Sequence, residues 1–209
     1  MKRNIFTTTA TTTRALLSCM LVSLAACGAP GETDGTGAGD NSEESSAALT
    51  NQNKPGAVVV FRRYNAVFTF GHVGWAYQVD TASHYHCGGI EGVPGRDQVE
   101  AGEFNGYWQK FGTWDQCLLW MKDRGYDGYR WGSVDVSKPK VANAMAKQWK
   151  KRGYSVINNN CANATWDVLN RFGVTGLPSL QFFPQPNDWF DNLGRTASDS
   201  IGWSDEIRL

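Results

Sequence analysis

The sequence predicts an α+β fold in which an antiparallel sheet packs against helices. Two observations predict it. Runs rich in valine, tyrosine and phenylalanine dominate residues 57–91, and turn residues at 80–83 separate the last two runs. Helical patterns dominate the later part, where apolar residues recur every three or four positions over 138–152 and again after Cys161. Strand runs followed by helix runs are typical of the α+β class.

The expected strands include a hairpin whose register follows from its turn. The runs that predict strands are 57–61, 66–70, 72–79 and 84–91. A two-residue loop at 81–82 would place His72 opposite Glu91. The same register places His84 opposite Val79. Because opposed residues of neighbouring strands lie about 5 Å apart, we expect Glu91 to lie nearer to His72 than His84 does.

The remaining elements follow from apolar spacing and from proline and glycine. In order, we expect a long ordered loop at 93–113, a helix at 114–122, a strand at 126–136, a helix at 138–152, a short strand at 154–157, a helix from Cys161 and a last helical turn at 187–193. Pro139 suits the start of the 138–152 helix and Gly153 suits its end. Residues 194–209 carry no clear pattern.

Residues 1–26 resemble a bacterial lipoprotein signal peptide. Basic residues precede an apolar run at 15–26 that is too short to cross a bilayer as a helix. Leu24-Ala25-Ala26-Cys27 matches the motif in which cleavage precedes a cysteine that then carries the lipid. We therefore expect lipid on Cys27, which would anchor the protein in the bacterial cell envelope, at the outer membrane or the cell surface.

Composition separates a linker from a globular domain. Residues 27–55 are rich in small and acidic residues with almost no large apolar side chain, which predicts a disordered linker. The domain is expected at 56–209, and the nine tryptophans of the chain supply a large core. From Pro55 onward 16 basic residues balance 15 acidic ones, so the domain lacks the excess of basic residues that is typical of nucleic-acid-binding proteins. We expect a monomer without a nucleic-acid partner.

Cys161 is the candidate nucleophile. The asparagines at 158–160 suit a helix N-cap, which places Cys161 in the first turn of the helix. Partial positive charge at a helix start stabilises a thiolate relative to a thiol. Such a nucleophile needs a proton-transfer partner, and His72, one of three histidines, heads the best strand of the sequence. The two residues therefore form a candidate catalytic pair.

These residues carry a resemblance to a known family. Gly71-His72-Val73-Gly74-Trp75 on a strand, then a hairpin, and much later Asn160-Cys161 at a helix start resemble the circularly permuted branch of the papain-like NlpC/P60 superfamily. That branch includes YiiX/YaeF-type bacterial proteins and lecithin:retinol acyltransferase-like enzymes. The match covers roughly residues 58–172. The resemblance implies a papain-like fold, Cys161 as nucleophile, His72 as base, and hydrolysis or transfer of an acyl group.

The third catalytic group is open between three residues. The strand register favours Glu91, whereas the resemblance places a polar group about a dozen residues after the base, which by count is His84. His86 follows on the same strand. His84 and His86 share a strand face and could begin a zinc site, but further ligands at a recognisable spacing are lacking. We therefore expect no metal and no cofactor.

The cysteines of the domain are expected to divide into a pair and a free thiol. Export places the domain in an oxidising compartment, where disulfides persist. If Cys161 must be a thiolate, Cys87 and Cys117 are left to form a disulfide.

Together these residues predict a cell-envelope thiol hydrolase or acyltransferase. It would cleave an amide or ester bond through an acyl-enzyme on Cys161, with peptidoglycan peptides as the leading substrate and lipid acyl groups next. The alternative is a non-catalytic binding module for a cell-wall or partner ligand. Its binding residues would be the aromatic side chains of one loop: Phe104, Tyr107, Trp108, Phe111 and Trp114. A reactive thiol beside His72 favours the enzyme, and a buried inert thiol favours the module.

Overall fold

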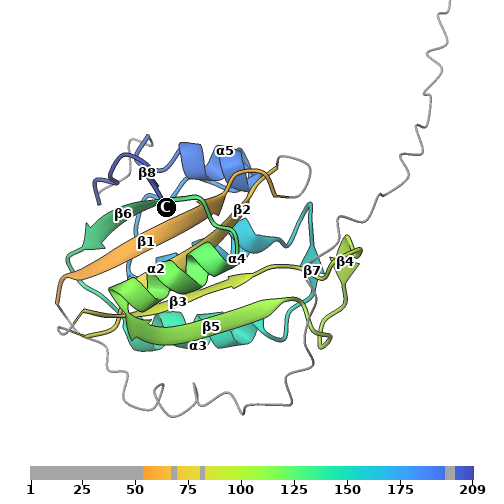
Figure 1. The fold of residues 1–209 in the computed structure, drawn as a ribbon, viewed down its shortest axis with the longest axis horizontal. Coiled ribbons are helices and arrows are strands. Elements are labelled where there is room, and N and C mark those ends of the chain that lie inside the picture. The colour runs from red at the N-terminus through yellow and green to blue at the C-terminus, as the bar shows by residue number, and fades with distance from the viewer. Residues whose placement is uncertain (1–53, 67–69, 81–82, 196–200) are drawn as a thin grey trace, which may run out of the picture. The chain divides into compact units, whose positions relative to one another are not determined.

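The computed structural model describes residues 54–66, 70–80, 83–195 and 201–209. The expected signal peptide, Cys27, most of the linker and the loop at 81–82 lie outside these residues. The described residues form an α+β fold in which a six-stranded antiparallel sheet packs against helices (Figure 1), as the sequence predicted. Among the helices described, none has the length and apolar character needed to cross a membrane.

The large sheet has the strand order β5-β3-β2-β1-β6-β8. Its strands are β1 (Gly56–Arg63), β2 (His72–Gln78), β3 (His84–Ile90), β5 (Tyr107–Thr113), β6 (Gly128–Val134) and β8 (Ile207–Arg208). Two short strands, β4 (Gln98–Val99) and β7 (Tyr154–Ser155), pair separately. The predicted register of the hairpin is confirmed, because Trp75 pairs with Gly88 and Ala76 pairs with Cys87.

The helices cover both faces of the sheet (Figure 1). They are α2 (Trp114–Asp123), α3 (Pro139–Trp149), α4 (Cys161–Phe172) and α5 (Pro186–Asp191). Strand β1 shows how the two cores divide, because its side chains alternate between faces. Val58 and Val60 belong to the larger core beneath α3 and α4, whereas Val59 and Phe61 belong to the smaller core beneath α2. We call the face of the sheet that α3 and α4 cover the α4 face, and the face that α2 covers the α2 face.

Two expectations about secondary structure were wrong. Ala66 and Phe70 lie in turns and not in a strand, and residues 67–69 between them are outside the described part. The expected loop at 93–113 contains β4 and the long edge strand β5. Strand β5 escaped prediction because both of its faces pack against apolar neighbours: Tyr107 and Phe111 face one core and Trp108 the other. Such a strand lacks the apolar and polar alternation of a half-exposed one.

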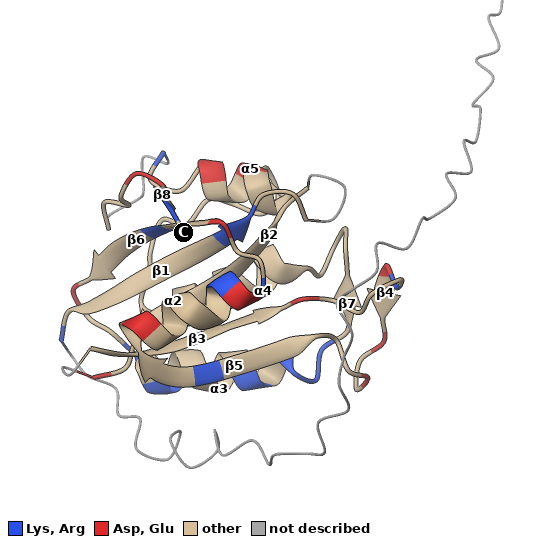
Figure 2. Cartoon of the chain, viewed as in Figure 1, with Lys and Arg blue, Asp and Glu red and all other residues tan. Residues whose placement is uncertain are grey.

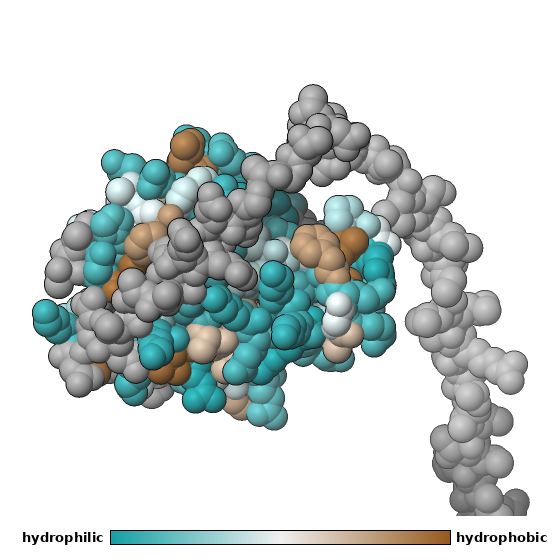
Figure 3. Space-filling model, turned by 90° about the horizontal axis from the view of Figure 1, so that it is seen from below, coloured by the Kyte–Doolittle hydropathy of each residue, from teal (hydrophilic) through white to brown (hydrophobic). Residues whose placement is uncertain are grey.

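The surface carries charges of both signs. Figure 2 shows basic residues on α3 and β5, and acidic residues on α2 and α5 and in connecting segments. In the view of Figure 3, hydrophilic residues predominate on the part that is not grey, and apolar residues form small separate patches. Binding sites on this side are therefore to be sought in local features and not in one extended apolar face.

A buried arginine joins the C-terminal segment to the sheet. The Arg62 side chain is 4% exposed, and its Nη1 lies 2.7 Å from Asp191 Oδ1 at the end of α5. Its Nη2 pairs with Glu206, which precedes β8. The guanidinium also lies 4.5 Å from the ring centroid of Phe190. One cation thus links β1, α5 and the C-terminal strand.

We predict that Arg62→Ala lowers the free energy of unfolding by about 2–4 kcal/mol, because it takes the buried cation away from Asp191 and Glu206 and removes the cation–π contact. Urea unfolding followed by circular dichroism measures this. The matched control is Arg208→Ala, whose side chain is 67% exposed and pairs with Glu206 at 3.5 Å. That change should cost less than about 1 kcal/mol. Equal losses in the two variants would contradict the role of Arg62.

Candidate active site

His72 and Glu91 form a buried ion pair at one end of the central hairpin. His72 Nε2 lies 2.9 Å from Glu91 Oε2, and the imidazole side chain is 1% exposed. Among the described residues neither ring nitrogen is aligned for a hydrogen bond, so the contact is ionic in this conformation. Catalytic hydrogen bonds are often poorly aligned before substrate binds. The neighbour that the hairpin register predicted for His72 is therefore found beside it.

Three further side chains hold the Glu91 carboxylate. Trp108 Nε1 donates a hydrogen bond to Oε1 at 2.7 Å, and the Tyr126 hydroxyl donates to the same oxygen at 3.1 Å. Arg63 Nη2 lies 3.8 Å from Oε2. Each of these three side chains favours the charged form of the carboxylate, and together they fix its position next to His72.

Glycines create the space for this arrangement. A Cβ at Gly74 of β2 would lie 2.7 Å from the Tyr126 hydroxyl, and a Cβ at Gly89 of β3 would lie 2.8 Å from it. Only glycine therefore allows the hydroxyl to approach the sheet here. Gly71, directly before His72, has φ of 80°, a conformation in which other residues are strained.

Cys161 is the first residue of α4, as the sequence predicted. The Asn160 side chain accepts hydrogen bonds from the backbone N–H of Ala162 at 2.9 Å and Asn163 at 3.4 Å. The Asn163 side chain in turn accepts from the Asn160 N–H at 3.0 Å. This capping box fixes where the helix begins, and it leaves the Cys161 N–H in the first turn, where N–H groups have no helical partner.

His72 links the thiol to the carboxylate. Its side chain lies within hydrogen-bond reach of Cys161 as well as of Glu91. Burial opposes a charge on the imidazole, but the negative charges of Cys161 and Glu91 outweigh it and raise the His72 pKa to about 10. For Glu91, burial is likewise outweighed by the charge of His72 and by hydrogen bonds, which lower its pKa to about 2. The site therefore favours a charged imidazolium beside the Glu91 carboxylate.

Tyr154 of β7 is a further neighbour of the thiol. Burial and the negative charges of Cys161 and Glu91 raise its pKa, so the phenol stays protonated. Tyr154 thus offers a donor close to Cys161. The Cys161 side chain itself is more enclosed than a surface nucleophile, since the residue is 2% exposed.

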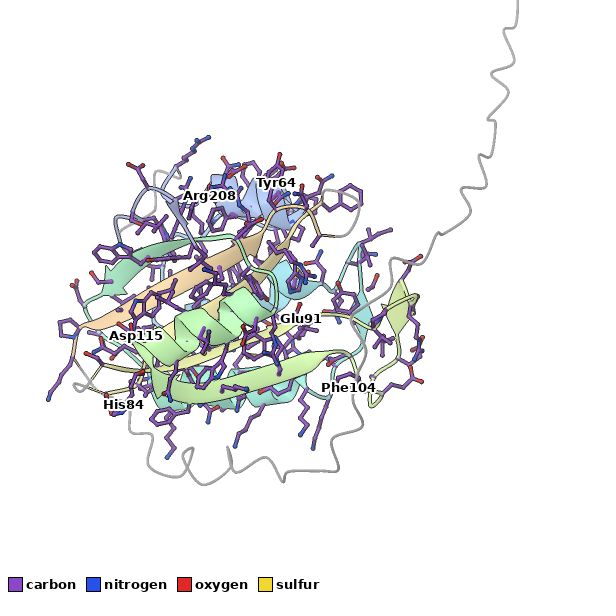
Figure 4. The ribbon with its side chains drawn as sticks, viewed as in Figure 1. Tyr64, His84, Glu91, Phe104, Asp115 and Arg208 are labelled. Atoms are coloured by element: carbon purple, nitrogen blue, oxygen red, sulfur yellow. The ribbon has the colours of Figure 1, made fainter. Side chains whose placement is uncertain are left out.

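The other two histidines are engaged elsewhere. His84 Nδ1 pairs with Asp80 at 2.7 Å, and Figure 4 shows His84 at the opposite end of β3 from Glu91. His86 Nδ1 lies 3.0 Å from the Tyr77 hydroxyl, and burial together with Lys147 lowers its pKa to about 4. Neither is the group beside His72. Within the described residues, no three potential ligands gather as a metal site would require.

Cys87 and Cys117 are neighbours but not a disulfide. Both are buried free thiols in the small core beneath α2, and their side chains are close enough to hydrogen-bond. Burial, followed by the contact with Cys87, raises the Cys117 pKa well above its usual value, which makes that thiol inert. The expected disulfide is thus absent from this structure, although Cys87 and Cys117, the two cysteines expected to form it, do lie together.

The aromatic residues of the alternative hypothesis do not share one surface. Tyr107 and Phe111 pack on the α4 face, and Trp108 and Trp114 pack on the α2 face. Phe104 is 72% exposed in the segment before β5, away from both (Figure 4). Because Phe104 precedes β5, Tyr107, Trp108 and Phe111 lie in β5, and Trp114 opens α2, the expected single binding loop is not formed.

Sequence reasoning missed the residues that support Glu91. Trp108, Tyr126 and Arg63 come from three separate elements, and no spacing rule connects them. The glycines at 74 and 89 were a usable signal, since glycine within a strand often marks a close approach. Tyr154 was recognised only as part of a short strand.

Comparisons with protein-family models, with curated proteins and with solved structures found no match to this chain.

The two pKa shifts predict how stability depends on pH. His72, raised from 6.5 to about 10, adds stability that is complete below pH 6.5 and is lost as the pH rises through about 10. Glu91, lowered from 4.5 to about 2, adds stability that is complete above pH 4.5 and is lost as the pH falls toward 2. The joint contribution should be greatest between pH 4.5 and 6.5.

Urea unfolding of wild type and Glu91→Gln, measured from below pH 4.5 to above pH 6.5, tests the pair. The excess stability of wild type should shrink below pH 4.5, because the variant has no carboxylate to protonate. Glu103→Gln is the control, since Glu103 also pairs with an arginine but its side chain is 47% exposed. An excess stability that does not change with pH would show that Glu91 is not ionised beside His72.

Proposed function

We propose that this domain is a thiol hydrolase or acyltransferase of the permuted papain-like type, with Cys161 as nucleophile. The observation that carries the proposal is the cluster of Cys161 at a helix start, the buried His72 within reach of it, and the Glu91 carboxylate 2.9 Å from the imidazole. A thiol nucleophile needs a proton-transfer partner within reach, and a carboxylate beside that partner orients the ring and favours its charged form.

The proposed reaction has two steps. The Cys161 thiolate attacks the carbonyl carbon of an amide or ester, and a C–S bond forms. The His72 imidazolium gives its proton to the departing amine or alcohol as that bond breaks. Water, or an acceptor hydroxyl or amine, then attacks the thioester while neutral His72 takes its proton, and the thiolate leaves. Glu91 acts through His72, by holding the ring and favouring its charge.

Two donors are available for the oxyanion of each tetrahedral intermediate. The Cys161 backbone N–H belongs to the first turn of α4, where N–H groups lack helical partners. The Tyr154 hydroxyl is protonated and close to the thiol. Donors placed where negative charge develops stabilise the transition state more than the ground state. Because Cys161 is 2% exposed, substrate must displace side chains that cover the thiol.

The proposed substrate class rests on location. A lipid-anchored protein of the cell envelope meets peptidoglycan peptides first and lipid acyl groups second, and both contain the amide or ester bond that this chemistry attacks. The Asn163 side chain, the capping residue Asn160 and the apolar residues around α4 offer no charge that would select between them.

A binding module without catalysis is the second candidate, favoured by the burial of Cys161. Turnover separates the two. Full-length protein should release soluble fragments from purified peptidoglycan or fatty acid from envelope lipids. Cys161→Ala should reduce this to background, and His72→Ala should lower kcat/KM by about 10²–10⁴-fold. His84→Ala is the matched control, because His84 lies on the same hairpin away from the site, and it should retain activity. Activity that survives Cys161→Ala would rule out the proposal.

Labelling tests the activation of the thiol without a known substrate. We expect iodoacetamide to modify Cys161 of wild type well below pH 8, with the sites mapped by mass spectrometry. In His72→Ala, labelling should rise only as the pH approaches about 8.5, where an ordinary thiol ionises. Cys87 and Cys117, both fully buried, serve as internal controls and should stay unmodified. Identical pH profiles for the two proteins would favour the binding module.

Two tyrosines should separate oxyanion stabilisation from support of the base. Tyr154→Phe removes a donor that acts in the transition state, so kcat should fall by about 10²-fold with little change in KM or in the pH profile. Tyr126→Phe removes a hydrogen bond that partly neutralises Glu91, so the basic limb of the pH–rate profile should move to higher pH as the His72 pKa rises. Equal effects on kcat and pH profile in both variants would contradict these separate roles.

A further inference from the structure

An aromatic cavity lies on the α2 face, away from the catalytic cluster. Its volume is about 230 Å³, and its lining comes from β1, β3, β6 and the first residue of α2: Ala57, Val59, Tyr85, Trp114, Tyr129 and Trp131. Figure 4 labels Asp115, the neighbour of Trp114, at one end of α2 and Glu91 beyond the other end. The cavity is therefore a separate feature, which the proposed hydrolysis does not use.

The aromatic rings of the cavity hold one another in place. The centroid of the Trp114 ring lies 5.1 Å from that of Tyr85 and 5.6 Å from that of Tyr129. Phe61 supports Trp114 from the small core at 6.0 Å. Trp131 is 49% exposed on β6, next to this group. The result is a preformed set of rings with an exposed tryptophan at its edge.

The polar groups of these rings have no hydrogen-bond partner among the residues that the structure describes. Within the described residues, the hydroxyls of Tyr85 and Tyr129 and the indole N–H groups of Trp114 and Trp131 make no hydrogen bond. Burial, followed by the neighbouring Cys117, raises the Tyr85 pKa, so this hydroxyl remains a neutral donor. None of the six lining residues carries a charge. The cavity thus combines aromatic faces with neutral hydrogen-bonding groups.

We propose that this cavity binds one sugar ring of a neutral glycan. The C–H faces of a pyranose ring pack against aromatic rings, and its hydroxyls hydrogen-bond with phenol hydroxyls and indole N–H groups. An acyl chain would leave those polar groups without partners, and a charged ligand would find no counter-charge. Cavities for drug-sized ligands measure about 300–1,000 Å³, so the smaller volume here suits about one ring.

The site adds glycan binding to the proposed reaction without depending on it. A sugar chain held on the α2 face would keep the protein on a polysaccharide while Cys161, at the start of α4 on the other face of the sheet, acts on another group. Binding is therefore measured independently of turnover.

The test is isothermal titration of the full-length chain with tetra-N-acetylchitotetraose, in a Cys161→Ala background so that no reaction heat intervenes. Trp131→Ala should weaken binding about tenfold or more, because it removes the exposed ring at the edge of the cavity. Trp131→Phe keeps an aromatic face and should weaken binding less. Phe104→Ala is the control, since Phe104 is a comparably exposed aromatic residue outside the cavity, and it should bind as wild type.

A second titration uses laurate as an acyl-chain probe. Absence of chitotetraose binding at millimolar concentration, or equal binding by wild type and Trp131→Ala, would overturn the proposal. Laurate binding that Trp131→Ala abolishes, without sugar binding, would assign the cavity to acyl chains and likewise overturn it. Loss of sugar binding in Trp131→Ala with an unchanged circular dichroism spectrum and unfolding midpoint supports it.

Discussion

The site depends on the cost of burying a charged imidazole. His72 is 1% exposed, and such burial alone would expel its proton. The charges of Cys161 on one side and Glu91 on the other reverse that preference and raise the pKa to about 10. Removing the Glu91 carboxylate would take the ion-pair partner from a buried imidazolium, which is strongly unfavourable. The positions of the thiol and the carboxylate are therefore linked through one ring.

Each anion is held by a different part of the fold. Glu91 directly follows β3 and receives hydrogen bonds from Trp108 of the edge strand and from Tyr126, which approaches over glycines of β2 and β3. Cys161 is held by the capping box of α4 on the other face of the sheet. His72, the first residue of β2, contacts both Glu91 and Cys161 and so connects the groups held on the two faces. The sheet thus separates the support of the base from the support of the nucleophile.

The α2 face carries two features of different chemistry. Near the C-terminal end of α2 the polar groups converge on Glu91, whereas at its N-terminal end the unpartnered polar groups surround the aromatic cavity. Phe61 lies between them, in contact with Trp114 and with Tyr126. In the first feature every donor is aimed at an anion of the protein. In the second, the donors have no partner among the described residues, and they are the groups that the proposed sugar would contact.

What the sequence by itself determined is local. The helix start at Cys161 follows from asparagine capping, and the proximity of Glu91 to His72 follows from the register of one hairpin. The edge strand β5, the donors Trp108 and Tyr126 and the neighbour Tyr154 were decided only by tertiary structure. They come together from segments that are distant in the chain, and neither periodicity nor capping encodes such contacts. Packing also left Cys87 and Cys117 as free thiols and enclosed Cys161, because burial depends on which elements cover a residue and not on the residues beside it in sequence.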